Sequence, residues 1–391
     1  MDRVRNWWSA AEVYFRSRVL AILFLGFSSG VPYGILAMTL SYWVAKINLP
    51  LADIGYLSTA GAPYAFKFLW SPIVDHVKLP LLTKVFGQRR SWLIIVQLML
   101  IPAIIWLGNT SPIDNYAETY MAAFLISILG ATQDIVIDGM RIESLEEDEQ
   151  AAGAASYIYG YRIAAIICGV GAIHFHADFG ANWPMVFTVG GLLIAVGFFT
   201  SLIIKEPQHV MTPEAIELDH QLESYLIRNP QIHGGTARML SWLHMAVVSP
   251  FKEFMTRRGW YVFLLFAIFY KLGDSLAVAL QTKFFLSVGF EDTVIADAGK
   301  LVGFWALLIG LGVGGLLMKR YGLWMSLLIC ALLQAVSNLM FSGLYLVGDS
   351  TVFLALTMGF ENFATGMGAT VLVAYLSLLC NRSFTITQYA L

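Results

Sequence analysis

The stretch VLAILFLGFSSGVPYGILAMTLSYWVA occupies residues 19–45 and contains no Asp, Glu, Lys or Arg. A helix needs about 20 mostly apolar residues to cross the hydrocarbon core of a bilayer. A secretory signal peptide has a shorter apolar region and an A-x-A-like cleavage site, a pattern that this stretch lacks. We therefore expect a retained first membrane span that begins near residue 18.

Similar apolar stretches recur along the 391 residues, which are 58% hydrophobic and only 13% charged, against about 25% charged in soluble domains. We predict ten spans and the start of an eleventh, at residues 18–45, 54–76, 92–108, 117–140, 152–175, 183–204, 260–287, 294–318, 322–343, 350–379 and 383–391. The stretches lack the alternation of barrel strands, so the expected spanning structure is helical. The predicted fold class is an all-α membrane protein.

Lys and Arg gather on one side of these spans: before span one and after spans two, four (Arg141), six, eight and ten. Because cytoplasmic loops carry the excess of Lys and Arg, we expect a cytoplasmic N-terminus. The polar stretch 205–258 separates an N-terminal half at 1–204, with spans one to six, from a C-terminal half at 259–391. This stretch is expected to be a cytoplasmic loop, with an interfacial helix at 237–254.

Two similar turns follow span two and span eight: SPIVDH at 71–76 and GLLMKRYG at 315–322. Both resemble the G-x-x-x-D-R-x-G turn of major facilitator proteins, although Ser71 replaces a glycine and Lys319 replaces the aspartate. The spans on either side of 205–258 suggest two six-helix halves, the second incomplete, and the resemblance of the turns implies a major facilitator fold. We expect Asp75 to lie near a neighbouring helix end and to lock one face closed, with Arg89 and Arg90 as further gating candidates. Ordinary basic stop-transfer loops are the alternative.

Ionisable side chains lie inside the predicted spans, where an unpaired charge costs from roughly 3 to more than 10 kcal/mol. Asp134 and Asp138 are four residues apart, so their carboxylates share one helix face. Lys271 and Asp274, three residues apart, can pair. The candidate binding and proton-coupling residues are Lys67, Asp134, Asp138, Arg162, Lys271, Asp274, Glu361 and Asn362. Alternatively, these groups form ion pairs that only hold the helices together, Asp134 with Arg162 for example.

Charges around one cavity imply a polar or ionic cargo. A carboxylate in a partly dry cavity can exchange protons, and a nearby cation favours its ionised form. We expect Glu361, or one of Asp134 and Asp138, to alternate between a protonated and a cation-paired state as the cavity opens to each side. Proton entry would then drive cargo entry, with the proton gradient as driving force and no cofactor.

Glycine and proline interrupt span one at 28–34, and broken helices in transporters commonly mark a binding site. The glycines at 310–315 and 366–368 fit close helix packing instead. Tyr33, Tyr42 and Trp43 can stack on sugar faces, or serve as lipid-belt or core residues. The three cysteines lack CxxC spacing, so neither a disulfide framework nor a metal site is expected.

A set of short motifs resembles the AmpG-type anhydromuropeptide permeases and follows their order across nearly the whole chain. The motifs are GFSSGVP at 26–32, AFKFLWSPIVD at 65–75, QDIVID at 133–138, GYR at 160–162, YKLGD at 270–274, ENFATGMG at 361–368 and CNRSFTITQYAL at 380–391. The resemblance implies proton-driven import of N-acetylglucosaminyl-anhydro-N-acetylmuramic acid, with or without its peptide, across the bacterial inner membrane for peptidoglycan recycling. A cation among Lys67, Arg162 and Lys271 would meet a carboxylate of this cargo. The last two helices of the fold are missing, so a truncated chain or a shortened gene product is expected.

Other functions stay open at this point. The broader family also resembles siderophore importers and acetyl-CoA carriers, so another bulky anionic cargo is the alternative within transport. A non-transporting sensor of cell-wall fragments would bind the same ligand without accumulating it. Neither a nucleic-acid partner nor a membrane enzyme is expected, since the sequence has no nucleophile and base constellation, metal spacing or phosphate-binding loop.

Overall fold

A computed structural model of the chain describes residues 11–207, 216–217, 220, 224, 248–291, 294–295, 298–381 and 383–390. Every regular element in these ranges is a helix, and the chain divides into two compact units. The N-unit comprises residues 20–145, 156–254 and 380–391, and the C-unit comprises residues 1–19, 146–155 and 255–379. Each unit therefore draws on segments that are distant in the sequence.

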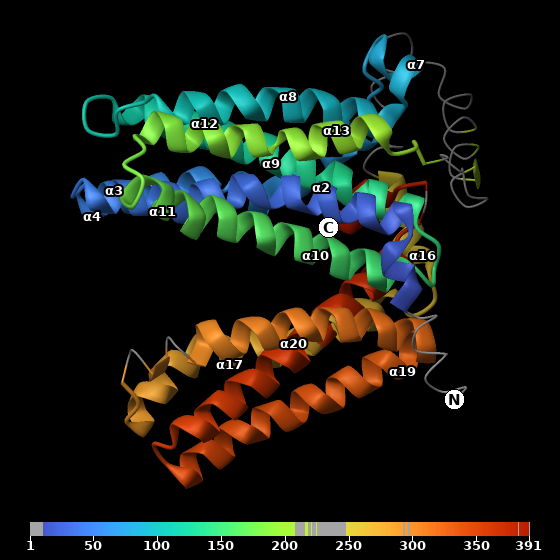
Figure 1. The fold of residues 1–391 in the computed structure, drawn as a ribbon. Helices are drawn as coiled ribbons and strands as arrows, with labels where there is room; N and C mark the ends of the chain where they lie inside the picture. The colour runs from blue at the N-terminus through green and yellow to red at the C-terminus, as the bar shows by residue number, and fades with distance from the viewer. Residues whose placement is uncertain are drawn as a thin grey trace. The chain divides into compact units, whose positions relative to one another are not determined.

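The N-unit is a bundle of long helices that run side by side (Figure 1). Its long elements are α2 (Ser17–Tyr33), α8 (Gln88–Gly108), α9 (Tyr116–Ser144), α10 (Gln150–Ile166), α12 (Trp183–Leu193) and α13 (Ala195–Ile203). Its shorter elements are η2 (Gly34–Leu40), α3 (Ser41–Lys46), α4 (Leu51–Ser58), η3 (Thr59–Gly61), α5 (Pro63–Phe66), η4 (Lys67–Leu69), α6 (Ser71–His76), α7 (Leu82–Phe86), η5 (Ile167–Gly171), α11 (Ala172–Ala177) and α21 (Thr385–Ala390). The first residues of α2 and α10 belong to the C-unit.

The C-unit is also helical in its described residues. It contains η1 (Glu12–Phe15), α17 (Trp260–Val288), η7 (Ala298–Gly303), α19 (Phe304–Val347) and α20 (Thr351–Leu379). The long α19 covers parts of two predicted spans and has a non-helical residue at Gly322, with φ 75° and ψ 175°. This positive φ favours glycine, which has no Cβ to clash, and it lies at the last glycine of the predicted turn.

Seven helices in the described residues are long and apolar enough to cross a membrane. They span Ser17–Lys46, Gln88–Gly108, Tyr116–Ser144, Gln150–Ala177, Trp183–Ile203, Phe304–Val347 and Thr351–Leu379. The predicted span at 54–76 is divided into short helical pieces from α4 to α6. The count of ten spans stays a prediction.

The structure bears on two further predictions, the break in span one and the interfacial helix. Span one is not broken at 28–34, because α2 runs through Pro32 and continues directly as the π-helix η2. Proline removes a hydrogen-bond donor from the helical ladder, and a π-helical turn is a common way to keep the backbone helical near such a site. The interfacial helix predicted at 237–254 lies mostly outside the described residues, and its described end belongs to α16 (Ser249–Thr256).

Glycine brings two helices into backbone contact within each unit. In the N-unit, a Cβ at Gly26 would lie 2.9 Å from Cα of Tyr157, and one at Gly30 would lie 2.8 Å from Cα of Tyr161. On the facing helix α10, a Cβ at Gly160 would lie 2.6 Å from the backbone nitrogen of Phe27. Real Cβ atoms do not approach this closely, so α2 and α10 can touch only because these positions lack side chains.

The same arrangement recurs in the C-unit between α19 and α20. A Cβ at Gly310 would lie 3.1 Å from Cα of Phe363, and one at Gly314 would lie 3.0 Å from Cα of Met367. The packing role predicted for the glycines at 310–315 fits these contacts.

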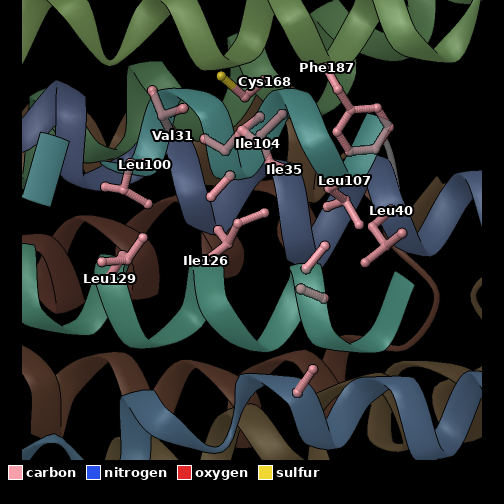
Figure 2. Close-up of a cluster of buried hydrophobic side chains, with 14 of the residues drawn as sticks. Val31, Ile35, Leu40, Leu100, Ile104, Leu107, Ile126, Leu129, Cys168 and Phe187 are labelled. Atoms are coloured by element: carbon pink, nitrogen blue, oxygen red, sulfur yellow. The ribbon is translucent and has the colours of Figure 1, made fainter. Parts of the chain in front are cut away.

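The apolar core of the N-unit lies between its long helices. Figure 2 shows ten of its buried side chains by label: Val31, Ile35, Leu40, Leu100, Ile104, Leu107, Ile126, Leu129, Cys168 and Phe187. They come from α2, η2, α8, α9, η5 and α12. Burial of these groups fixes the rotation of each helix, and therefore decides which side chains face the polar sites described below.

We predict that Gly160→Leu lowers the stability of the N-unit. The added side chain meets backbone atoms of α2, which cannot move aside as a flexible side chain would. We therefore expect the free energy of unfolding to fall by about 3 kcal/mol, the upper end of the usual range for overpacking. The measurement is the thermal unfolding midpoint of the detergent-solubilised protein. Gly55→Leu is the control, because a Cβ at Gly55 meets nothing within 4 Å. Equal midpoints for the two variants would contradict the close-contact account.

Candidate functional site

A cluster of ionisable groups lies inside the N-unit around α9. Asp134 and Asp138 are both buried on this helix, and their spacing of four residues places them on one face. Lys67, in η4, approaches this face, with Nζ 3.9 Å from Oδ2 of Asp138. The structure thus brings three of the predicted site residues together.

Asp134 is held by hydroxyl groups. Ser29 of α2 donates its hydroxyl to Oδ1 of Asp134 over 2.5 Å, and the phenol oxygen of Tyr157 in α10 lies 2.8 Å from Oγ of Ser29. A hydroxyl both donates and accepts hydrogen bonds. The linked hydroxyls of Ser29 and Tyr157 can therefore donate a hydrogen bond to an ionised Asp134 carboxylate or accept one from a protonated Asp134 carboxyl.

Asp138 is surrounded by cations instead. Besides Lys67, its partner is the guanidinium of Arg141, 3.4 Å away. Arg141 is fully buried and lies over the ring of Tyr389, with Cζ 5.2 Å from the ring centroid. The prediction that Arg141 belongs to a basic loop after span four is wrong, because α9 continues to Ser144 and carries Arg141 into the interior.

The expected pair of Asp134 with Arg162 is not formed. Arg162 is exposed on α10 and has no ion pair within the described part of the chain. Tyr157, not Arg162, is the α10 residue that reaches the hydroxyl chain of Asp134.

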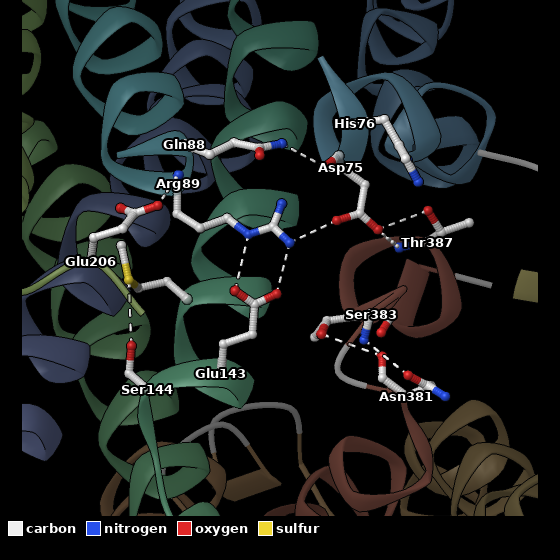
Figure 3. Close-up of polar contacts among 12 residues, drawn as sticks. Asp75, His76, Gln88, Arg89, Glu143, Ser144, Glu206, Asn381, Ser383 and Thr387 are labelled. Atoms are coloured by element: carbon white, nitrogen blue, oxygen red, sulfur yellow. Dashed lines mark hydrogen bonds and ion pairs between the residues drawn. The ribbon is translucent and has the colours of Figure 1, made fainter. Parts of the chain in front are cut away.

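A second buried cluster lies at the ends of α6, α8 and α9. The guanidinium of Arg89 donates to Oδ1 of Asp75 and to Oε1 of Glu143, each over 2.7 Å (Figure 3). All three side chains are at most 4% exposed. A buried ion pair costs desolvation energy and repays it only with good geometry and further hydrogen bonds, which this triad has through a second contact from Nε of Arg89 to Glu143.

Asp75 also binds the start of α21. Its Oδ2 accepts hydrogen bonds from the backbone N–H and the hydroxyl of Thr387, at 3.2 and 3.1 Å. A carboxylate is favourable at a helix N-terminus, where backbone N–H groups are otherwise unpaired. The structure therefore places Asp75 beside the first turn of α21, while the lock expected of this residue stays a prediction.

Arg90 has a different environment from Arg89. Its guanidinium donates to the carbonyl oxygens of Ser201 and Leu202 near the end of α13, where unpaired carbonyl groups attract cations. The carboxylate of Glu206 accepts from the backbone N–H groups of both arginines. Burial raises the pKa of Glu206, while these N–H groups favour its ionised form.

The remaining candidates belong to the C-unit. Glu361 is buried in α20 and accepts a hydrogen bond from the hydroxyl of Thr365 over 3.2 Å. Asn362 donates to the carbonyl oxygen of Met358 in its own helix. Lys271 lies half-buried in α17, and the side chain of Asp274 lies outside the described part of the chain.

Four residues of these clusters were not predicted as site residues: Tyr157, Glu143, Glu206 and Thr387. Ser29 lies in the segment 28–34 that was expected to mark a binding site, but its contact with Asp134 was not predicted. The i, i+3 spacing of Asp138 and Arg141 was available as a signal for a buried pair. The partners of Asp134 gave no such signal, because Ser29 and Tyr157 are far apart in the sequence and meet only through helix packing.

Comparisons with known proteins agree with this architecture. The family model for the Major Facilitator Superfamily matches residues 22–388. The chain is 32% identical to "Putative transporter AmpG 4" of Rickettsia felis, over 97% of this chain and 86% of that protein. It is also 32% identical to "Anhydromuropeptide permease" of Escherichia coli (strain K12), over 97% of this chain and 71% of that one.

Solved structures resemble the fold at low sequence identity. The proton:xylose symporter XylE bound to 6-bromo-6-deoxy-D-glucose has a TM-score of 0.58 at 14% identity, covering 99% of this chain and 86% of that one. The Escherichia coli fucose:proton symporter FucP has a TM-score of 0.61 at 12% identity, covering 96% and 87%.

Proposed function

We propose that this chain, which belongs to the major facilitator superfamily and to its AmpG-type permeases, imports anhydromuropeptides across the bacterial inner membrane, driven by the proton gradient. Its relatives are transporters and permeases rather than enzymes. In this proposal the N-terminus is cytoplasmic, and the cargo enters peptidoglycan recycling.

The observation that carries proton coupling is the hydroxyl chain from Tyr157 through Ser29 to Asp134. A carboxylate paired with a cation is held ionised, whereas one paired with hydroxyls can be satisfied in both protonation states. Among the carboxylates that the sequence left open, Asp134 is therefore our choice for the coupling group. Asp138, beside Lys67 and Arg141, is assigned to charge balance.

Lys67 is our candidate for cargo recognition. Its side chain is 27% exposed, and its contact with Asp138 is long, at 3.9 Å. A partly solvated ion pair of this length is weak, so a carboxylate of the cargo can replace Asp138 as its partner. Protonation of Asp134 would lower the negative charge facing Lys67 and favour this exchange.

Asp75, Arg89 and the first turn of α21 support a gating role. The carboxylate of Asp75 holds the guanidinium of Arg89 on one side and Thr387 on the other. A transporter that alternates between two faces must break some contacts at each step. A charge-assisted contact to a helix end is strong enough to favour one state and weak enough to break.

The test of the proposed function is uptake of labelled anhydromuropeptide by cells that lack their own permease and express this chain. We expect accumulation that a protonophore abolishes. A folded and inserted protein that gives no accumulation would overturn the proposal and leave another bulky anionic cargo as the alternative. Binding without accumulation would indicate a sensor.

We predict that Asp134→Asn lowers protonophore-sensitive accumulation at least tenfold and leaves exchange of cargo across the membrane active. The amide preserves the shape and the contact with Ser29 but cannot bind and release a proton. The measurement compares uphill uptake with counterflow in proteoliposomes. Asp114→Asn, at an exposed carboxylate, is the matched control and is expected to match the unaltered protein. Unchanged uphill uptake in Asp134→Asn would remove Asp134 from coupling.

We predict that Asp75→Asn shifts the balance between inward-open and outward-open states. The neutral amide weakens both the pair with Arg89 and the contact with the helix end, each a charge-assisted bond contributing about 1.5–3 kcal/mol. Accessibility of introduced single cysteines to a membrane-impermeant thiol reagent measures the shift. Asp178→Asn, at an exposed carboxylate beside His174, serves as the control. If Asp75→Asn changed neither accessibility nor transport, Asp75 would have no gating role.

A further inference from the structure

Arg141 is a fully buried cation that contacts two groups from different parts of the N-unit. Its Nη2 lies 3.4 Å from Oδ1 of Asp138, and its Cζ lies 5.2 Å from the ring centroid of Tyr389. Asp138 is also the partner of Lys67, and Tyr389 belongs to α21. We propose that Arg141 is a positioning residue that links the state of Lys67 to the release of α21, an inference whose cargo step rests on the proposed function.

Asp138 shares its charge between two cations, and neither pair is tight. Its Oδ2 lies 3.9 Å from Nζ of Lys67, and its Oδ1 lies 3.4 Å from Arg141, whereas charge-assisted hydrogen bonds to nitrogen are usually about 2.7–2.9 Å long. Interactions between buried charges are screened little. When a carboxylate of the cargo takes Lys67, Arg141 is the cation that Asp138 retains, and the attraction between these two residues draws them together.

Tyr389 competes with Asp138 for the guanidinium of Arg141. A cation is attracted to the face of an aromatic ring within about 6 Å of the ring centroid, and Cζ of Arg141 is 5.2 Å from that of Tyr389. This separation is close to the limit, so a small displacement weakens the contact. In the proposed step, the guanidinium turns toward Asp138 and loosens its hold on the ring.

Helix α21 is short, so its contacts with neighbouring helices decide whether it stays docked. It has six residues, and an isolated helix of this length is not stable in water. Ile386 fills the space at Gly139 of α9, where a Cβ would lie 2.6 Å from Cγ1 of Ile386. Thr387 binds Asp75 of α6 through its backbone N–H and its hydroxyl. Loss of the contact of Tyr389 therefore removes a substantial part of what holds α21.

One turn of α9 carries both the charge pair and the seat of α21, because Asp138, Gly139 and Arg141 all lie within residues 138–141. Helix α21, docked or released, is the two-state element that coupling between distant groups requires. A cargo at Lys67 favours release, and release in turn favours cargo at Lys67, because coupling between two sites is reciprocal. An empty transporter therefore keeps α21 docked. A purely structural contact would hold α21 equally firmly in both cases.

The test measures hydrogen–deuterium exchange of the backbone amides at 383–390 in the detergent-solubilised protein without cargo. Lys67→Gln imitates the departure of Lys67 from Asp138, and we expect it to speed this exchange at least about fivefold. Adding Asp138→Asn removes the carboxylate that draws Arg141 away, and should return exchange to within about twofold of the unaltered protein. Exchange at 156–166 of α10 is the internal reference and should not change.

Variants of Tyr389 test the route. Tyr389→Phe keeps the ring, so Lys67→Gln should still speed exchange about fivefold in this background. Tyr389→Leu removes the ring and should speed exchange by itself, to a rate that Lys67→Gln then changes by less than about twofold. This rate should stay below that of a free peptide of the same sequence, because Thr387 remains bonded to Asp75. Lys46→Gln removes a lysine charge elsewhere in the N-unit and is the matched control, expected to leave exchange unaltered.

Several outcomes would overturn the link between Lys67 and α21. They are an unchanged exchange in Lys67→Gln, an increase that Asp138→Asn does not reverse, an increase that adds fully to that of Tyr389→Leu, free-peptide exchange in Tyr389→Leu, and an equal increase at 156–166. None of these measurements needs cargo, so they are independent of uptake. If uptake of anhydromuropeptide fails while the link holds, the proposed function is wrong and the link stands. If uptake succeeds and the effects are additive, only the link is wrong.

Discussion

The contact between α2 and α10 is the constraint on which the candidate site depends. Gly26, Gly30 and Gly160 leave no side chain between the two helices, so the backbones touch. This approach places Ser29 and Tyr157 within hydrogen-bond distance of each other, and Ser29 reaches Asp134 on the adjacent α9. A wider separation of these helices would leave a carboxylate buried without partners, at a cost that a membrane interior makes severe.

Helix α9 carries three buried carboxylates in three different environments. Asp134 has hydroxyl partners, Asp138 has cations, and Glu143 shares Arg89 with Asp75. The differences have chemical consequences, because a cation fixes a carboxylate in its ionised form while hydroxyls accommodate both forms. The proposed proton-coupling and gating groups can therefore lie on one helix in separate environments.

Much of the fold was predictable because apolar length and glycine spacing are local properties. The stretch at 19–45 predicted a membrane helix, and the glycines at 310–315 predicted close packing. Errors arose where local rules compete. Pro32 and its neighbouring glycines suggested a broken helix, but the chain continues as a π-helix. Arg141 looked like a loop cation, but α9 extends past it, and Asp138 and Tyr389 surround it.

The sequence by itself determined the class of protein, the family and the carboxylates that must be compensated, because hydropathy, motif order and the i, i+4 spacing of Asp134 and Asp138 need no knowledge of distant contacts. Only the tertiary structure decided which partner each charge has. Arg162 was a plausible partner for Asp134 by depth alone, yet it lies exposed while Ser29 and Tyr157 provide the contact. The reason is geometric: helix rotation and separation are set by core packing and glycine contacts between segments more than a hundred residues apart, and these decide which side chains meet.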